Sequence, residues 1–116
     1  MNVFSDSEID LSPELVARRL QLGELVLVDV REGYEWDAGR VPGSHHIEIE
    51  YVASRAPQIP RDQAVAFMCL GGIRSAMVAR AFRAAGYEAY NVAGGFREWV
   101  AAGLPVEPEG FTIAPH

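Results

Sequence analysis

The feature that most constrains the fold is a short apolar run at residues 64–68, which passes directly into a glycine-rich turn and then into a helical pattern. An apolar run without polar alternation is typical of a strand buried on both faces of a parallel sheet. Behind the turn, residues 76–85 place apolar side chains on one helical face and Arg80 and Arg83 on another, and Gly86 ends the pattern. The stretch therefore predicts a strand–loop–helix unit, with Cys69 at the end of the strand.

Apolar runs and helical patterns alternate along the rest of the chain. Strands are predicted at residues 8–11, 25–28, 45–49 and 89–92. Helices are predicted at residues 13–22 and 96–102, with shorter helical turns at 32–39 and 50–55. We expect a single α/β domain over residues 1–116, in which a central, largely parallel five-stranded sheet is flanked by helices in three layers. The core covers about residues 11–105, and the proline-containing tail, 106–116, should be irregular.

Length and charge exclude several classes of function. At 116 residues the chain fits one domain, and its net charge of −6 disfavours binding to nucleic acid or to an anionic membrane. All ten basic residues are arginines, so Schiff-base chemistry on a lysine is excluded. Residues 1–6 lack the basic start of a signal peptide, and no apolar run approaches the ~20 residues of a membrane helix. A single cysteine cannot form an internal disulfide, so we expect a cytoplasmic protein.

Cys69 is the strongest candidate for a chemical role. A thiol reacts as the thiolate, and a free thiol with a pKa of about 8.5 is mostly protonated at neutral pH. Gly71 and Gly72 let the backbone curl, so that successive N–H groups and the positive end of the following helix can stabilise a negative charge. Arg74 can bind an anion through two hydrogen bonds, and Ser75 can cap the helix. The alternative is that Cys69 is a small buried apolar residue and that the glycines only make a turn.

Other polar residues are better explained by structure than by chemistry. Asp29 and Arg31 end a predicted strand, and we expect local ion pairing there, with Arg31 and Glu32 or Glu35 as candidate partners. The pair His45 and His46 lacks a second cysteine or clustered carboxylates at ligand spacing, so no metal site is predicted. Two tryptophans, at positions 36 and 99, are expected to pack in the core, and the carboxylates at 48 and 50 should face water.

Three stretches of the chain together resemble the single-domain rhodanese family of sulfurtransferases. Residues 29–44 (DVREGYEWDAGRVPGS) are similar to the first signature of that family, and residues 69–75 (CLGGIRS) resemble its active-site loop. Residues 91–99 (NVAGGFREW), with GLP at 103–105, resemble its closing segment. The resemblance runs from about residue 11 to residue 105 and implies the rhodanese-like fold.

The resemblance also implies a function and roles for individual residues. Cys69 would take a sulfane sulfur from thiosulfate or a similar anionic donor, become a persulfide, and pass the sulfur to a thiol, to cyanide or to a sulfur-accepting protein. The residues of the anion-binding loop would be Leu70, Gly71, Gly72, Ile73, Arg74 and Ser75. Asp29 and Arg31 would give structural support, and no cofactor is implied.

Loop length separates the branches of this family. Cys69 to Arg74 spans six residues, which resembles the sulfur-handling members, whereas Cdc25-type phosphatases use one residue more. The chain differs from the common pattern at Arg40, where a histidine is usual, and at Leu70, where a polar residue often follows the cysteine. Two other hypotheses stay open: a non-catalytic sulfur-relay or binding module, and a small phosphatase or arsenate reductase.

Overall fold

The computed structural model describes residues 8–116 and has a five-stranded parallel sheet at its centre. The strands, in the spatial order β1-β5-β4-β2-β3, are β1 (Asp10–Leu11), β5 (Ala89–Val92), β4 (Ala64–Met68), β2 (Leu25–Asp29) and β3 (His45–His46). Each neighbouring pair is parallel. The predicted five-stranded α/β fold is therefore confirmed. The prediction that residues 1–6 form no signal peptide concerns a stretch outside the described residues.

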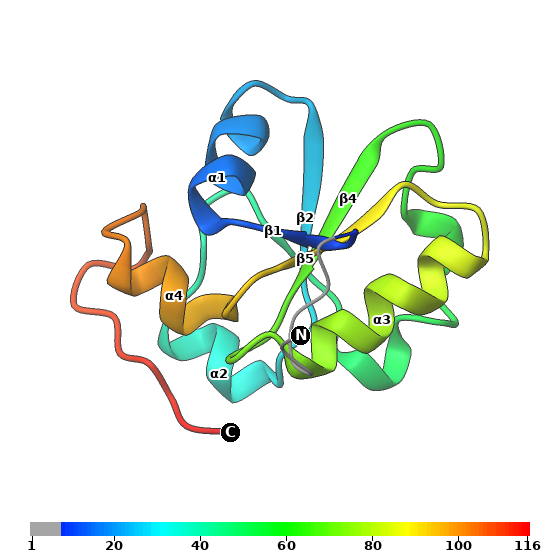
Figure 1. Ribbon diagram of the computed structural model, residues 1–116. Coiled ribbons are helices and arrows are strands. Elements are labelled where there is room, and N and C mark those ends of the chain that lie inside the picture. Colours follow the sequence, from blue (N-terminus) through cyan, green and yellow to red (C-terminus); the bar gives the residue numbers. More distant parts are fainter. Residues whose placement is uncertain (1–7) are drawn as a thin grey trace.

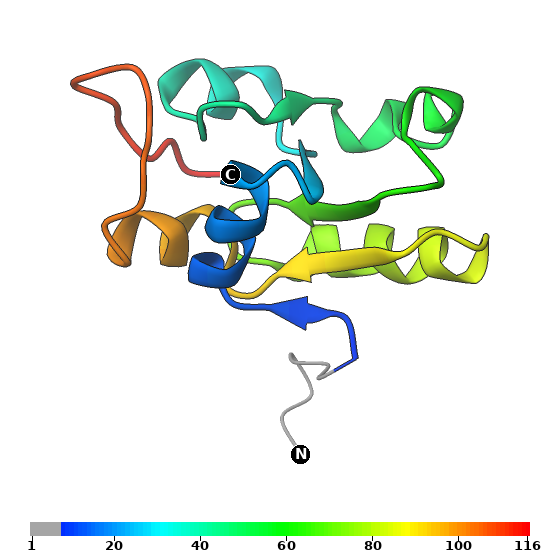
Figure 2. The same ribbon diagram turned by 90° about the horizontal axis from the view of Figure 1, so that it is seen from above.

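Helices cover both faces of the sheet, as Figures 1 and 2 show. Helix α3 (Ile73–Ala84) lies on one face, together with two 3₁₀ turns, η1 (Ile49–Tyr51) and η2 (Ala56–Gln58). Helices α1 (Pro13–Gln21) and α4 (Gly95–Ala101) lie on the other face, and α2 (Gly33–Ala38) follows β2 at the carboxyl end of the sheet. None of the helices within residues 8–116 is long and apolar enough to cross a membrane.

Strand β4 is buried on both faces because it has no polar alternation. Val65 and Phe67 pack in the core beneath α3, whereas Ala66 and Met68 pack in the core beneath α1 and α4. All five residues of the strand are buried. This double burial fixes the register of the central strand, and with it the position at which Cys69 leaves the sheet.

Several predicted elements differ from those in the structure, and β1 contains only Asp10 and Leu11 of the predicted residues 8–11. Strand β3 contains only His45 and His46, instead of residues 45–49, and the helix expected at 50–55 is replaced by the turns η1 and η2. The chain turns early because Ile49 and Val52 pack against the core beneath α3. By contrast, α1 begins at Pro13 as predicted, with the Ser12 hydroxyl accepting a hydrogen bond from the Leu15 N–H (3.2 Å).

The C-terminal tail has no further helix, but it packs against the chain around α2. Arg40 and Glu107 exchange two backbone hydrogen bonds of 2.8 Å each, and the Thr112 N–H donates to the Ala38 carbonyl (2.9 Å). A Cβ added at Gly39 would lie 3.0–3.2 Å from atoms of Phe111 and Thr112, so glycine favours this close approach. The tail therefore ends at the carboxyl end of the sheet, close to the loop that follows β4 (Figure 1).

Candidate active site

Cys69 lies at the carboxyl end of β4, where the chain turns into α3. The residue is 1% exposed. Gly72 has a φ of +95°, and an added Cβ would come within 3.1 Å of the Gly94 nitrogen, so both the turn and the packing require glycine. Helix α3 begins immediately afterwards, at Ile73. The turn folds the start of α3 back over the sulfur.

Three hydrogen-bond donors surround the sulfur of Cys69. The Gly72 N–H lies 3.1 Å from Sγ and the Ser75 N–H lies 3.5 Å from it, while the Ser75 hydroxyl oxygen is 3.3 Å away. Gly72 is the N-cap of a 12-residue helix and Ser75 lies in its first turn, and the positive end of this helix favours an anion. The site can therefore hold a negatively charged sulfur without a metal or a lysine.

The start of α4 shapes the same loop from behind. The Phe96 N–H donates to the Cys69 carbonyl (2.8 Å) and the Arg97 N–H donates to the Leu70 carbonyl (3.1 Å). A side chain at Gly95, which has a φ of +63°, would collide with both of those carbonyls. Because two carbonyls of the loop are bound by α4, they are turned away from the sulfur. The start of α4 therefore fixes the loop that carries Cys69.

Arg74 is fixed by a buried carboxylate. Its two terminal nitrogens lie 3.3 and 3.4 Å from the oxygens of Glu35, a side chain with no exposed surface. Burial by itself raises the pKa of Glu35, but the Glu32 N–H, the Arg74 guanidinium and His116 outweigh burial and hold that pKa below its ordinary value. Glu35 is therefore an anion at neutral pH and keeps Arg74 beside the cysteine loop.

A small hollow of about 250 Å³ lies beside Cys69. Its lining consists of Cys69, Leu70, Gly71, Ile73, Arg74, Arg97 and His116. Leu70 and Ile73 give it apolar walls, and two arginines give it positive charge. His116 approaches Glu35, with its Nδ1 3.2 Å from a carboxylate oxygen. The hollow can therefore admit a small anion beside the thiol.

The structure corrects three details of the predicted site. Helix α3 begins at Ile73 rather than at residue 76, so Arg74 and Ser75 belong to its first turn and Ser75 does not cap it. The cap position is Gly72. Within residues 8–116, the backbone N–H groups that contact the sulfur are those of Gly72 and Ser75, whereas a longer series of loop amides was expected. The helix starts early because it has no proline or other helix-breaking residue after Gly72.

Asp29 and Arg31 lie behind the site as a fully buried ion pair. Two nitrogens of the Arg31 guanidinium lie 2.8–3.0 Å from the Asp29 carboxylate. The guanidinium also donates to the carbonyls of Glu35 (3.3 Å) and Gly39 (2.7 Å) and lies 4.1 Å from the centre of the Phe96 ring. Local pairing was predicted here, and Asp29 and Arg31 are each other's partners, whereas the carboxylate of Glu35, another predicted partner, pairs with Arg74. The arginine joins β2 to both ends of α2 and to α4.

Sequence reasoning missed four residues near the thiol: Glu35 as the partner of Arg74, together with Asn91, Arg97 and His116. Asn91 carried a signal in hindsight, because a polar residue in a short apolar strand that leads into two glycines requires a buried partner. Arg97 and His116 carried none, because the tertiary fold brings them to the hollow.

Three carboxylates gather outside the site. Oxygens of Glu32, Glu48 and Glu50 lie within 4.8 Å of one another at the surface, although no such cluster was expected. A hydrogen bond with Glu48 is the main cause that raises the pKa of Glu32. We assign the three carboxylates no function, because exposed acidic groups often gather without a ligand.

His46 lies 2.7 Å from the Arg31 carbonyl through its Nε2 and stacks on Trp36, whose side chain is only partly buried.

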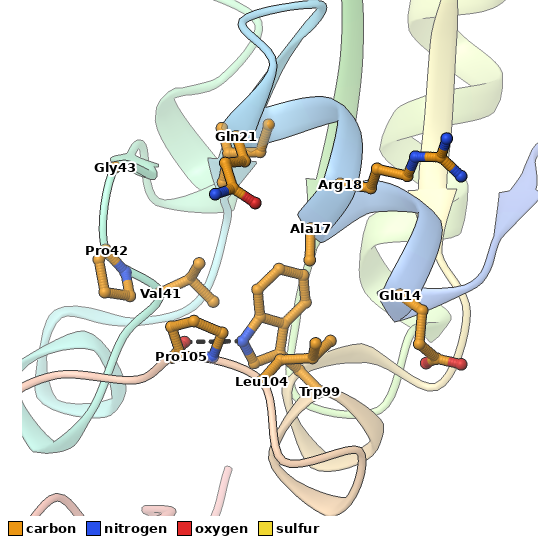
Figure 3. Close-up of a pocket in the computed structure, with 11 residues that line it drawn as sticks. Glu14, Ala17, Arg18, Gln21, Val41, Pro42, Gly43, Trp99, Leu104 and Pro105 are labelled. Carbon is orange, nitrogen blue, oxygen red and sulfur yellow. Dashed lines mark hydrogen bonds between the residues drawn. The ribbon is translucent and has the colours of Figure 1, made fainter.

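A larger hollow, about 660 Å³, lies between α1, residues 41–43 and the end of α4 (Figure 3). Trp99 forms its floor and donates from Nε1 to the Pro105 carbonyl (2.9 Å). The hollow is lined mostly by apolar side chains and contains neither the cysteine nor a histidine. The larger hollow is therefore not the chemical site, which is identified by the presence of Cys69 and not by volume.

Comparisons with known proteins agree with the fold. Residues 12–102 match the model of the rhodanese-like domain. The chain is 31% identical over 99 residues to the thiosulfate sulfurtransferase GlpE of Actinobacillus succinogenes, covering 84% of this chain and 89% of that protein. It is 33% identical over 108 residues to an HTH-type transcriptional regulator of Mycobacterium tuberculosis, covering 91% of this chain but only 48% of the regulator.

A solved structure gives the same result. The rhodanese-related protein of Thermoplasma volcanium superposes with a TM-score of 0.79 at 25% identity, covering 85% of this chain and 97% of that one. The family model spans most of the described chain and includes β4, the cysteine loop and α4. The chain belongs to the rhodanese-like family.

Proposed function

We propose that the protein is a sulfurtransferase that carries a sulfane sulfur on Cys69 as a persulfide. The observation that carries the proposal is the placement of the Cys69 sulfur, which lies near two N–H donors and a hydroxyl, in a residue that lines a hollow together with two arginines. A purely structural cysteine needs neither the donors nor the hollow. The sulfurtransferase GlpE, which the chain resembles over most of its length, supports the same activity.

In the first step the Cys69 thiolate attacks the outer sulfur of thiosulfate. A bond forms between the two sulfurs, the sulfur–sulfur bond of thiosulfate breaks, and sulfite leaves with the electron pair. The product is a cysteine persulfide anion, so the total charge is unchanged. In the second step a thiolate or cyanide attacks the outer sulfur of the persulfide, and the Cys69 thiolate leaves with its electrons.

The residues of the loop have different roles in this reaction. The Gly72 and Ser75 N–H groups stabilise the sulfur when it is an anion, both before the first step and after the second. Arg74, which Glu35 holds in place, and Arg97 attract the anionic donor and orient it. Gly71 leaves the hollow open, and Leu70 and Ile73 exclude water from one side. The six-residue span from Cys69 to Arg74 favours sulfur transfer over phosphate chemistry.

The donor is tested by mass spectrometry of the intact protein. Reduced protein is incubated with thiosulfate, with a small-molecule persulfide or with mercaptopyruvate, and excess donor is removed before weighing. A gain in mass of one sulfur atom is expected with at least one donor in the wild type and with none in Cys69→Ser. If the wild type gains no sulfur from any donor while its thiol still reacts with iodoacetamide, the proposal is wrong.

A further inference from the structure

Asn91, on β5, is a buried polar residue beside the cysteine loop. The residue is 3% exposed, and its side chain faces the core beneath α3, where neighbouring positions are apolar. A buried amide is costly unless each of its polar groups finds a partner. The partners of Asn91 therefore show what it does in this place.

Every hydrogen-bonding group of the Asn91 amide is used. Its nitrogen donates to the Asp10 carboxylate on β1 (2.9 Å) and to the Gly72 carbonyl (3.1 Å). Its oxygen lies 2.5 Å from the Ser75 hydroxyl. The amide cannot be reversed, because its oxygen would then face two acceptors. Asp10 and Gly72 thus fix the direction in which the Asn91 oxygen points, which is toward Ser75.

The Ser75 hydroxyl has one proton and two candidate acceptors. Its oxygen lies 2.5 Å from the Asn91 oxygen and 3.3 Å from the Cys69 sulfur. The Asn91 oxygen carries no hydrogen, so the short contact needs the serine proton. While Cys69 is a neutral thiol, Ser75 therefore donates to Asn91 and can accept the S–H. Once the sulfur becomes an anion, the hydroxyl gains more by donating to it.

We propose that Asn91 is a positioning residue for the Cys69 sulfur, because it competes with that sulfur for the single proton of the Ser75 hydroxyl. The competition follows from the geometry alone, and the proposal rests on the proposed function only in saying what the competition is used for. In the second step of sulfur transfer the departing thiolate requires a donor within reach, and Asn91 keeps the hydroxyl of Ser75 aimed between the two acceptors. Asn91 itself does not touch the donor, since it lies beneath the loop.

The first test is the pH profile of alkylation by iodoacetamide, which requires no sulfur transfer. In Asn91→Leu, a change of similar volume, the serine proton is free to bind the thiolate. The pH of half-maximal alkylation should therefore fall by about 0.5–1 unit, the size of one neutral hydrogen bond. The matched control is Val92→Ala, on the opposite face of β5, which destabilises the same strand and should leave this pH unchanged.

The double variant isolates the shared proton. In the Ser75→Ala background no hydroxyl remains to share, so Asn91→Leu should shift the profile by less than half as much as in the wild type. An undiminished shift in that background, or no shift in the wild-type background, would overturn the proposal. If the alkylation result holds but no donor loads sulfur, the proposed function fails and the role of Asn91 stands.

A second measurement uses the wild-type protein and so does not depend on the folding of a variant. The sequence has only one other asparagine, Asn2, so the side-chain amide of Asn91 can be assigned readily in a nitrogen-15 spectrum. Its signals should move with pH at the same midpoint as alkylation, because the Asn91 oxygen loses its donor when the thiol ionises. Signals that stay unchanged through this midpoint would contradict the competition.

Discussion

Glu35→Gln should destabilise the protein by an amount that depends on pH. At neutral pH the Glu35 carboxylate accepts hydrogen bonds from the Glu32 N–H (3.0 Å) and from Arg74 (3.3 and 3.4 Å). A glutamine keeps one acceptor oxygen but loses the charge. Hydrogen bonds to charged groups contribute about 1.5–3 kcal/mol, and Arg74 can recover part of this by hydration because its side chain is 20% exposed. We expect a loss of about 1–2 kcal/mol at pH 7.

The sign of the pH dependence follows from the lowered pKa of Glu35. A carboxyl whose pKa is lower in the folded than in the unfolded protein stabilises the fold above the unfolded value. That contribution is lost as the pH falls from the ordinary value of 4.5 through the lowered pKa. The difference in stability between wild type and Glu35→Gln should therefore be largest near neutral pH and should shrink below pH 4.5.

Urea unfolding at several pH values measures this effect. For a protein of this size the expected loss lowers the urea midpoint at pH 7 by about 1 M. Asp37→Asn, an exposed carboxylate on the same helix, is the matched control and should change stability by less than about 0.5 kcal/mol. Equal midpoints at pH 7 would refute the role given to Glu35. So would a difference that persists unchanged in acid, where the wild-type carboxyl is protonated.

Three further substitutions test other parts of the structure. Gly95→Ala should lower the free energy of unfolding by about 2 kcal/mol or more, and by clearly more than Gly103→Ala. Both glycines have positive φ, but only a side chain at Gly95 would collide with the cysteine loop. Equal losses of stability in thermal melts would argue against that packing. Arg31→Met leaves the Asp29 carboxylate buried without its partner, so it should lower the free energy of unfolding in urea titrations by about 3–5 kcal/mol. A loss below about 1 kcal/mol would contradict the structural role of this pair. Trp99→Phe should lower the free energy of unfolding by about 1–3 kcal/mol. It should leave sulfur loading unchanged, because the ring lines the larger hollow, which does not contain Cys69. Impaired loading in a folded variant would show that the larger hollow affects the cysteine site.

The fold was predictable where the sequence pattern is local. Residues 25–28 and 64–68 are continuous apolar runs, and runs of this kind form strands that are buried on both faces wherever the chain places them. Ser12, followed by Pro13, marked the start of α1 correctly because capping depends only on the first turn of the helix.

The site was predictable only in part, because several of its contacts join distant positions. Cys69 was evident as a lone thiol before two glycines. The contacts of Glu35 with Arg74 and His116 span 39 and 81 residues, and a sequence pattern carries no signal for such pairs. The contact of Asn91 with Asp10 likewise depends on the parallel pairing of β1 with β5, which brings these two residues into register. Long-range register, rather than local propensity, decides these contacts.

The central claim is that Cys69 stores a transferable sulfur, and a single-turnover measurement tests it most directly. Protein loaded from a donor is freed of that donor, mixed with cyanide, and analysed for both thiocyanate and the mass of the intact chain. The account predicts one equivalent of thiocyanate per loaded chain and a return to the original mass, with neither change in Cys69→Ser. Loaded protein that keeps its added mass in excess cyanide, or thiocyanate formed equally by Cys69→Ser, would contradict it.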